Sequence, residues 1–149
     1  MAHILIVEDN SLVGTLLCEA IVLAGHSADC VTTKSDAERL LGTRAHALAV
    51  VDIHLPDGSG LDFAVRAESL GIESILTTAD HEKAAEMAEA GIGVLVKPFG
   101  MAEFERLIAA KLLSKDQAAC PNPAQGTRYP EHRCDRDQAA ERKYAITPH

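Results

Sequence analysis

The sequence lacks an excess of basic residues. Its 149 residues include 14 Lys+Arg against 22 Asp+Glu, which gives a formal net charge of −8 at pH 7. A chain with this balance has no basic field to hold a nucleic-acid backbone, so we do not expect direct nucleic-acid binding. The length, with 47% hydrophobic and 24% charged residues, is typical of one soluble globular domain.

Long hydrophobic runs are also missing. The apolar stretches at 4–7 and 46–51 fall far short of the roughly 20 residues that cross a bilayer, so no membrane span is predicted. The N-terminus has no basic region before its apolar run and does not match a secretion signal. We therefore expect a cytoplasmic protein.

Cysteine is scarce and its spacing is uninformative. The four cysteines have neither the CxxC spacing of a zinc site nor the density of a disulfide scaffold. In a cytosolic setting they are expected to be free thiols. They are Cys18, Cys30, Cys120 and Cys134.

Composition changes near residue 114. Residues 1–114 hold 8 basic and 17 acidic residues, a charge of −9, whereas residues 115–149 hold 6 and 5, a charge of +1. The second segment contains four prolines and no sustained apolar period. We expect one folded domain over 1–114 and a mostly disordered tail over 115–149, with a short helix near 137–144 and no output domain.

The first segment alternates short apolar runs with helical patterns. The strand-like runs are 4–7, 28–32, 47–51, 74–77 and 94–96. Asn10 is predicted to cap the first helix, and 35–38 has the form of a capping box for the second. In the first helix the predicted apolar face is Val13, Leu16, Leu17, Ala20 and Ala24. Four helices are predicted to end at a glycine in the left-handed conformation, namely Gly25, Gly42, Gly71 and Gly91. This alternation predicts an α/β fold with five parallel strands covered by helices on both faces.

Functional side chains follow four of the five predicted strands. Glu8 and Asp9 follow the first, Asp52 ends the third, Thr78 follows the fourth and Lys97 follows the fifth. In open parallel sheets ligands bind beyond the carboxyl ends of the strands. Three carboxylates that converge there repel one another unless a cation is present, and Mg²⁺ suits an acidic cluster that receives a phosphoryl group. Lys97 and Thr78 would then contact phosphate as a point charge and a hydroxyl donor.

Four segments together resemble a known family, the receiver domains of two-component response regulators. These segments are 4–10 (ILIVEDN), 51–60 (VDIHLPDGSG), 75–79 (ILTTA) and 96–99 (VKPF). The resemblance covers residues 2 to about 114. It implies a flavodoxin-like, doubly wound (βα)5 fold with strand order 2-1-3-4-5.

The resemblance also implies a role for each site residue. Asp52 would be the phosphoacceptor, and Asp9 and Asp52 would bind Mg²⁺ directly. Glu8 would act on the metal through water, and the carbonyl of His54 would supply another ligand. Thr78 and Lys97 would contact the phosphoryl oxygens, and the peptide bond between residues 97 and 98 would be cis.

The implied function is that of a stand-alone phosphorylation switch. Asp52 would accept a phosphoryl group from a histidine kinase or a histidine phosphotransferase, and output would be contact with an unidentified downstream protein or phosphate relay. The chain would be no enzyme beyond phosphoryl transfer to Asp52 and its hydrolysis. The exposed apolar residues of the first helix, including Leu12 and Val22, would either dock the donor or complete the core.

Two alternatives come from other classes of protein. A magnesium-dependent phosphatase of the haloacid dehalogenase type also forms an aspartyl phosphate, but it needs a second Asp two residues after the nucleophile, where this sequence has His54. A phosphate-independent interaction module normally loses an acidic, Thr or Lys position, and none is lost here.

Three positions bear on how such a switch would behave. Receivers often have Tyr or Phe three residues before the lysine, where this chain has Val94, which either alters signalling or simply packs in the core. His54 and Asp80 lie two places after the phosphoacceptor and the threonine, positions that in receivers flank the path of the hydrolytic water. Asp80 is also suited to capping the fourth helix.

Overall fold

The computed structural model describes residues 2–43 and 45–117. Five parallel strands form one sheet, and a two-stranded antiparallel hairpin lies beside it. The sheet strands are β1 (His3–Val7), β2 (Ser27–Val31), β3 (Leu48–Asp52), β6 (Glu73–Thr78) and β7 (Gly93–Val96), and the hairpin strands are β4 (His54–Leu55) and β5 (Gly58–Ser59). The helices are α1 (Ser11–Leu23), α2 (Lys34–Leu41), α3 (Gly60–Ser69), α4 (His81–Glu89) and α5 (Met101–Gln117).

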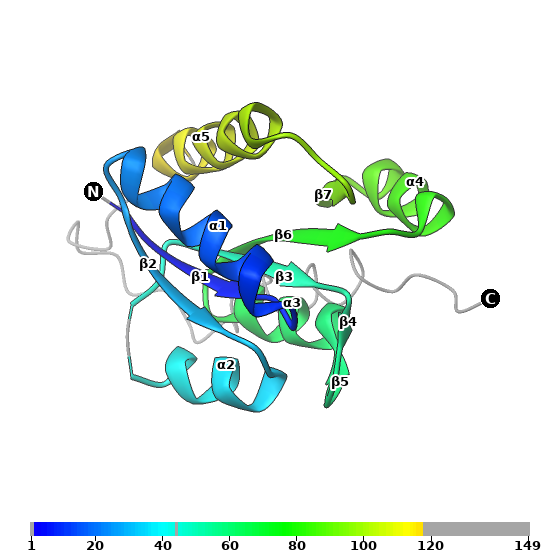
Figure 1. Ribbon diagram of the computed structural model, residues 1–149, viewed down its shortest axis with the longest axis horizontal. Helices are drawn as coiled ribbons and strands as arrows, with labels where there is room; N and C mark the ends of the chain where they lie inside the picture. Colours follow the sequence, from blue (N-terminus) through cyan, green and yellow to red (C-terminus); the bar gives the residue numbers. More distant parts are fainter. Residues whose placement is uncertain (1, 44, 118–149) are drawn as a thin grey trace, which may run out of the picture.

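The strand order is β2-β1-β3-β6-β7, with every neighbouring pair parallel. Because β4 and β5 form the separate hairpin, this is the 2-1-3-4-5 order that the resemblance implied. Figure 1 shows α1 and α5 together on one side of the sheet and α2 and α3 on the other. The predicted α/β fold with a doubly wound parallel sheet is confirmed.

The sheet is buried on both faces, and alternate strand residues contribute to two separate cores. Leu5 of β1 packs in the core beneath α2, α3 and α4, whereas Ile4 and Ile6 pack beneath α1 and α5. Phe63 of α3 and Phe104 of α5 are the largest fully buried side chains of the two cores. A strand buried on both sides has no polar face, which explains the nearly continuous apolar runs in the sequence.

Two predicted helix starts are confirmed and one is wrong. The side chain of Asn10 accepts hydrogen bonds from the first turn of α1, and that of Asp80 does the same for α4. The cap of α2 is Thr33, which accepts from the N–H of Asp36, so Ser35 lies inside the helix and does not cap it. The first residue of a capping box must have a non-helical backbone conformation. Here the last non-helical residue before α2 is Thr33, two residues before Ser35.

The helix ends need a similar correction. Gly25, Gly71 and Gly91 adopt the predicted left-handed conformation, with φ between 78° and 90°. Gly42 instead has φ −83°, within the right-handed region. In α1, Leu16 and Ala24 are exposed although they were predicted on the buried face, and Ile21 is buried in their place. The cause is the register of the helix, which turns Gly14, Leu17 and Ile21 toward the sheet.

Several predictions concern residues outside the described part of the chain. They are residues 118–149 of the predicted disordered tail, the short helix near 137–144 and the thiols of Cys120 and Cys134. The tail was predicted to begin at residue 115, which is wrong because residues 115–117 continue α5. Within the described residues Cys18 and Cys30 are free thiols, as predicted. No helix in residues 2–43 and 45–117 is long and apolar enough to cross a bilayer.

Candidate functional site

The predicted site residues come together at the carboxyl ends of the sheet strands. Glu8 and Asp9 directly follow β1, Asp52 is the last residue of β3, Thr78 is the last of β6, and Lys97 directly follows β7. The parallel pairing of β1 with β3, β3 with β6 and β6 with β7 sets these strand ends side by side. Five positions spread over 90 residues of sequence therefore form one cluster.

Three carboxylates form the acidic part of this cluster. Oxygen atoms of Glu8, Asp9 and Asp52 all lie within 4.8 Å of one another. Glu8 and Asp52 are buried, whereas Asp9 is exposed to solvent. Carboxylate oxygens gathered at an open edge are the ligands that Mg²⁺ prefers, and one exposed member leaves room for the waters this ion keeps. The donor set therefore fits the magnesium ion that the sequence suggested.

Lys97 neutralises two of these carboxylates. Its Nζ atom lies 2.9 Å from Oε2 of Glu8 and 2.7 Å from Oδ2 of Asp52. Burial by itself would lower the pKa of the Lys97 ammonium, but the hydrogen bonds to Asp52 and Glu8 outweigh it and raise that pKa. Lys97 is therefore a fixed positive charge at the point where a phosphoryl group on Asp52 would need one.

Glu8 is the carboxyl group of this cluster whose pKa is raised. Burial raises the pKa of its carboxyl from the usual 4.5 to about 6, although the hydrogen bond with Lys97 opposes the change. The pKa of Asp9 is lowered in turn, chiefly by its hydrogen bond with Glu8. A bound cation favours the charged form of the carboxylates beside it.

The backbone after β3 holds Asp52 in place. Oδ1 of Asp52 accepts a hydrogen bond from the N–H of His54 (2.9 Å), which leaves Oδ2 to Lys97. Gly60, the first residue of α3, lies so close to Asp52 that an added Cβ would be 2.0 Å from the Asp52 carbonyl oxygen. Only glycine allows this approach. The glycine at position 60 of the 51–60 motif is therefore explained by packing against the Asp52 backbone.

Thr78 is placed to offer a hydroxyl proton. The side chain is buried, and its Oγ1 atom accepts a hydrogen bond from the N–H of Asp80 (3.0 Å). The carbonyl of Thr78 accepts from the N–H of Lys97 (2.8 Å), so the two residues share one end of the β6–β7 ladder. A hydroxyl that accepts in this way keeps its proton for a phosphoryl oxygen.

The two residues predicted to flank the site differ in placement. The side chain of His54 is exposed on the β4–β5 hairpin. Asp80 accepts hydrogen bonds from the N–H groups of Glu82 (3.0 Å) and Lys83 (3.1 Å), which confirms its role as the cap of α4.

Val94, at the position where receivers often have an aromatic residue, is half-buried and packs against the core beneath α2, α3 and α4.

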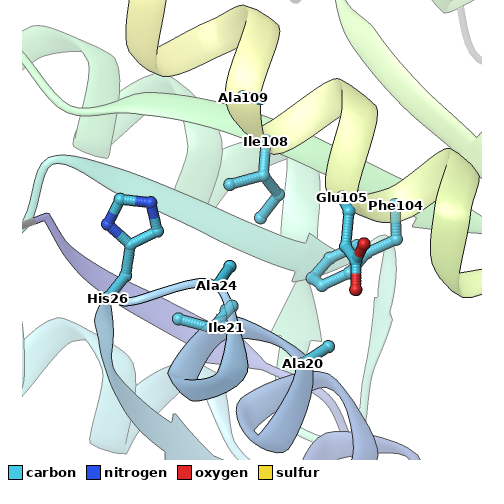
Figure 2. Close-up of a pocket in the computed structure, with 8 residues that line it drawn as sticks. All are labelled: Ala20, Ile21, Ala24, His26, Phe104, Glu105, Ile108 and Ala109. Atoms are coloured by element: carbon cyan, nitrogen blue, oxygen red, sulfur yellow. The ribbon is translucent and has the colours of Figure 1, made fainter.

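A separate cavity of about 260 Å³ lies between α1 and α5. Figure 2 shows Ile21 of α1 facing Phe104 and Ile108 of α5, with His26 in the loop just before β2. None of the predicted site residues lines it. The cavity is mainly apolar and holds no cluster of carboxylates, so it does not compete with the strand-end cluster as a phosphorylation site.

The comparison with protein families agrees with the geometry of the strand-end cluster. The family model described as the response regulator receiver domain matches residues 4–109. The chain belongs to this family.

Similar proteins include full-length regulators. The chain is 36% identical over 118 residues to the transcriptional regulatory protein BasR of Escherichia coli, covering 73% of this chain and 51% of BasR. It is 37% identical over 106 residues to the swarming motility regulation protein RssB of Serratia marcescens, covering 68% of this chain and 48% of RssB. The chain thus spans about half the length of these curated relatives.

Solved structures show the same fold. A CheY-like receiver domain protein from Methanospirillum hungatei superposes with a TM-score of 0.71 at 24% identity, covering 78% of this chain and 98% of that one. The response regulator protein TrrA from Thermotoga maritima, solved in complex with Mg²⁺–BeF, gives a TM-score of 0.67 at 24% identity, covering 74% of this chain and 99% of TrrA.

Proposed function

We propose that this receiver domain accepts a phosphoryl group on Asp52 from a histidine kinase or a histidine phosphotransferase. The observation that carries the proposal is the position of the Lys97 ammonium, 2.7 Å from Oδ2 of Asp52 and 2.9 Å from Oε2 of Glu8. A buried aspartate with one fixed cation and two further carboxylates beside it is suited to phosphoryl transfer, which depends on positioning and charge neutralisation.

The transfer itself exchanges one bond to phosphorus for another. A carboxylate oxygen of Asp52 forms a bond to the phosphorus while the bond between phosphorus and the donor imidazole nitrogen breaks, and that nitrogen keeps the electron pair. Lys97 balances charge on the transferred oxygens, and the Thr78 hydroxyl donates a hydrogen bond to one of them. Asp52 is thus the nucleophile, and the other two residues stabilise the transferred group.

Magnesium is the cation that this site would hold. Asp9 and Asp52 would bind it directly, Glu8 would act through water, and the carbonyl of His54 would add a ligand. When bound, Mg²⁺ neutralises the charge that develops on the phosphoryl oxygens. The Mg²⁺–BeF complex of TrrA supports this assignment because TrrA has the same fold.

The test is labelling with acetyl phosphate and magnesium, read by intact mass. We expect one added phosphoryl group on the wild-type chain and none on Asp52→Asn. Asp62→Asn, an exposed aspartate in the first turn of α3, is the matched control and should label normally. Equal labelling of Asp52→Asn would refute the assignment.

We further propose that the output is a protein contact or phosphate relay. The described surface supports this because α1 exposes apolar side chains along its length, with Leu12 in the first turn after Asp9 and Val22 and Leu23 at the far end of the helix. The chain has no basic excess that would favour nucleic acid. The test is to compare proteins retained by the wild-type chain with beryllofluoride and magnesium against those retained by Asp52→Asn under the same conditions. A set of partners that does not depend on Asp52 would contradict a phosphorylation-gated contact.

The phosphatase alternative is not favoured. It requires an aspartate acid/base two residues after the nucleophile, and the residue there is His54, whose side chain is exposed on the hairpin. The geometry therefore favours a domain that is phosphorylated over one that hydrolyses the phosphate of another molecule.

A further inference from the structure

Two histidines and an aspartate converge at the end of the sheet opposite the phosphorylation site. His3 is the first residue of β1, Asp29 lies in β2, and His46 precedes β3. Nε2 of His3 lies 2.7 Å from Oδ2 of Asp29, and Nε2 of His46 lies 3.0 Å from the same oxygen. Ligand atoms from all three residues lie within 4.8 Å of one another. Three segments of the chain thus each place one nitrogen or oxygen in this small cluster around Oδ2 of Asp29.

A serine fixes the orientation of one histidine ring. Nδ1 of His3 lies 2.6 Å from Oγ of Ser27, and the Ser27 hydroxyl is directed at the carbonyl of Ala2 (3.5 Å). Because that hydroxyl has a single proton, Ser27 accepts from an Nδ1–H of His3. Metal-binding histidines commonly donate their second ring nitrogen to an oxygen in this way, which turns the other nitrogen toward the ion.

The surroundings of His46 add a second observation. Its side chain has no exposed surface, and its Nδ1 atom has no hydrogen-bond partner among the described residues. The imidazole is therefore held by Asp29 and by stacking on His3, with ring centroids 4.9 Å apart. His3 and Asp29 are each about one-quarter to one-fifth exposed, so two of the three side chains reach solvent.

We propose that His3, Asp29 and His46 bind a divalent transition-metal ion of the Zn²⁺ class. Two imidazoles and one carboxylate are a common ligand set for such ions, whereas magnesium prefers oxygen ligands alone. Ligands about 2.0–2.1 Å from a tetrahedral zinc are roughly 3.3 Å apart, so the observed 2.7 and 3.0 Å need to open by only a few tenths of an ångström. The ion would join β1, β2 and the start of β3, and the solvent side would leave a position for water.

The site is independent of phosphorylation. His3 begins β1, His46 precedes β3 and Asp29 is the middle residue of β2, whereas Asp52 and Lys97 lie at the carboxyl ends of their strands. A failure of zinc binding would therefore leave the proposed phosphorylation of Asp52 standing, and a failure of acetyl phosphate labelling would leave the zinc site standing.

The test is zinc titration of the full chain by calorimetry, with excess magnesium to occupy the acidic cluster. We expect one Zn²⁺ per chain, and an affinity at least about tenfold lower in His3→Gln and His46→Gln. Ser27→Ala should cost about tenfold as well, because it removes the oxygen that orients His3. His81→Gln, an exposed histidine at the start of α4, is the matched control and should bind as the wild type does.

Two further measurements keep the result interpretable. Zinc should raise the melting temperature of the wild type and of His81→Gln but not that of His3→Gln. This comparison remains informative even if His46→Gln fails to fold because His46 is buried. Cobalt in place of zinc should give visible bands without the charge transfer typical of thiolate ligands, which excludes the cysteines as the site. Absence of zinc binding, or equal affinity in all variants, would overturn the proposal.

Discussion

The carboxylate of Asp57, in the turn between β4 and β5, accepts a hydrogen bond from the backbone N–H of Lys34, the first residue of α2 (2.7 Å). Its second oxygen accepts from the N–H of Ser35 (2.9 Å). Asp57 therefore satisfies two of the N–H groups that the first turn of a helix leaves without a partner, from more than 20 residues away in sequence. The loop after Asp52 is thereby tied to the start of α2.

This contact predicts a pH-dependent contribution to stability. The hydrogen bonds from Ser35 and Lys34 lower the pKa of Asp57, so its stabilising effect is present above the pKa of the unfolded chain and is lost as the pH falls through the folded value. Asp57→Ala should lower the melting temperature at pH 7, and the difference from wild type should shrink below about pH 4. Glu89→Ala, an exposed acid at the end of α4, is the control. An unchanged difference across this range would contradict the prediction.

Glu8 should act in the opposite sense. Its pKa of about 6 lies above the usual 4.5, so the folded state holds an extra proton between these values and loses stability as the pH rises through 6. Glu8→Gln should therefore raise the free energy of unfolding at pH 7 without magnesium by about 1–2 kcal/mol. The gain should disappear near pH 4, and magnesium should stabilise the variant less than the wild type. Denaturant unfolding at both pH values checks this, and a variant less stable at pH 7 would refute it.

Gly60 tests whether the Asp52 backbone is fixed by close packing. A Cβ at this position meets backbone atoms of Asp52 and Ile53 at 2.0–2.9 Å, so the chain must shift. Gly60→Ala should lower stability by about 1–3 kcal/mol and slow labelling of Asp52 by acetyl phosphate. Gly100→Ala meets nothing within 4 Å and should leave both unchanged. Normal labelling of a folded Gly60→Ala protein would show that the close approach does not position Asp52.

Much of the fold could be predicted because the strands are short, apolar and regularly spaced, and because Asn10 and Asp80 cap the helices that directly follow them. The strand-end cluster followed from the same regularity. The β4–β5 hairpin was missed because two-residue strands have no period to detect. Two sets of contacts could not be predicted because they join segments that are distant in the sequence and carry no local pattern. They are the contact of Asp57 with α2 and the contacts of His3 and His46 with Asp29.

The exposed apolar residues of α1 predict where a phosphoryl donor docks. Leu12 is 77% and Val22 60% exposed, so these side chains do not complete the core. Leu12→Glu or Val22→Glu should slow phosphotransfer from a cognate donor while labelling by acetyl phosphate stays normal. Leu70→Glu is the control, because Leu70 is 58% exposed and lies at the end of α3. Equal slowing with both donors, or an equal effect of Leu70→Glu, would contradict docking on α1.

The lifetime of the phosphorylated state should depend on His54. Its N–H donates to Oδ1 of Asp52, and its side chain is exposed on the β4–β5 hairpin next to this contact. An imidazole near a phosphoryl group on Asp52 can hydrogen-bond to the attacking water or block its approach. Asp80, at the corresponding position after Thr78, has its carboxylate engaged with the first turn of α4 and should matter less.

We therefore expect the rate of phosphate loss from the purified phosphoprotein to change in His54→Asn. The measurement is that rate at one pH and at saturating magnesium, so that loss of the metal does not imitate the effect. His81→Asn is the matched control, since His81 is also exposed but begins α4 behind the Asp80 cap. Equal rates for wild type and His54→Asn would leave His54 with only the roles of its backbone, the N–H that binds Asp52 and the carbonyl proposed for magnesium.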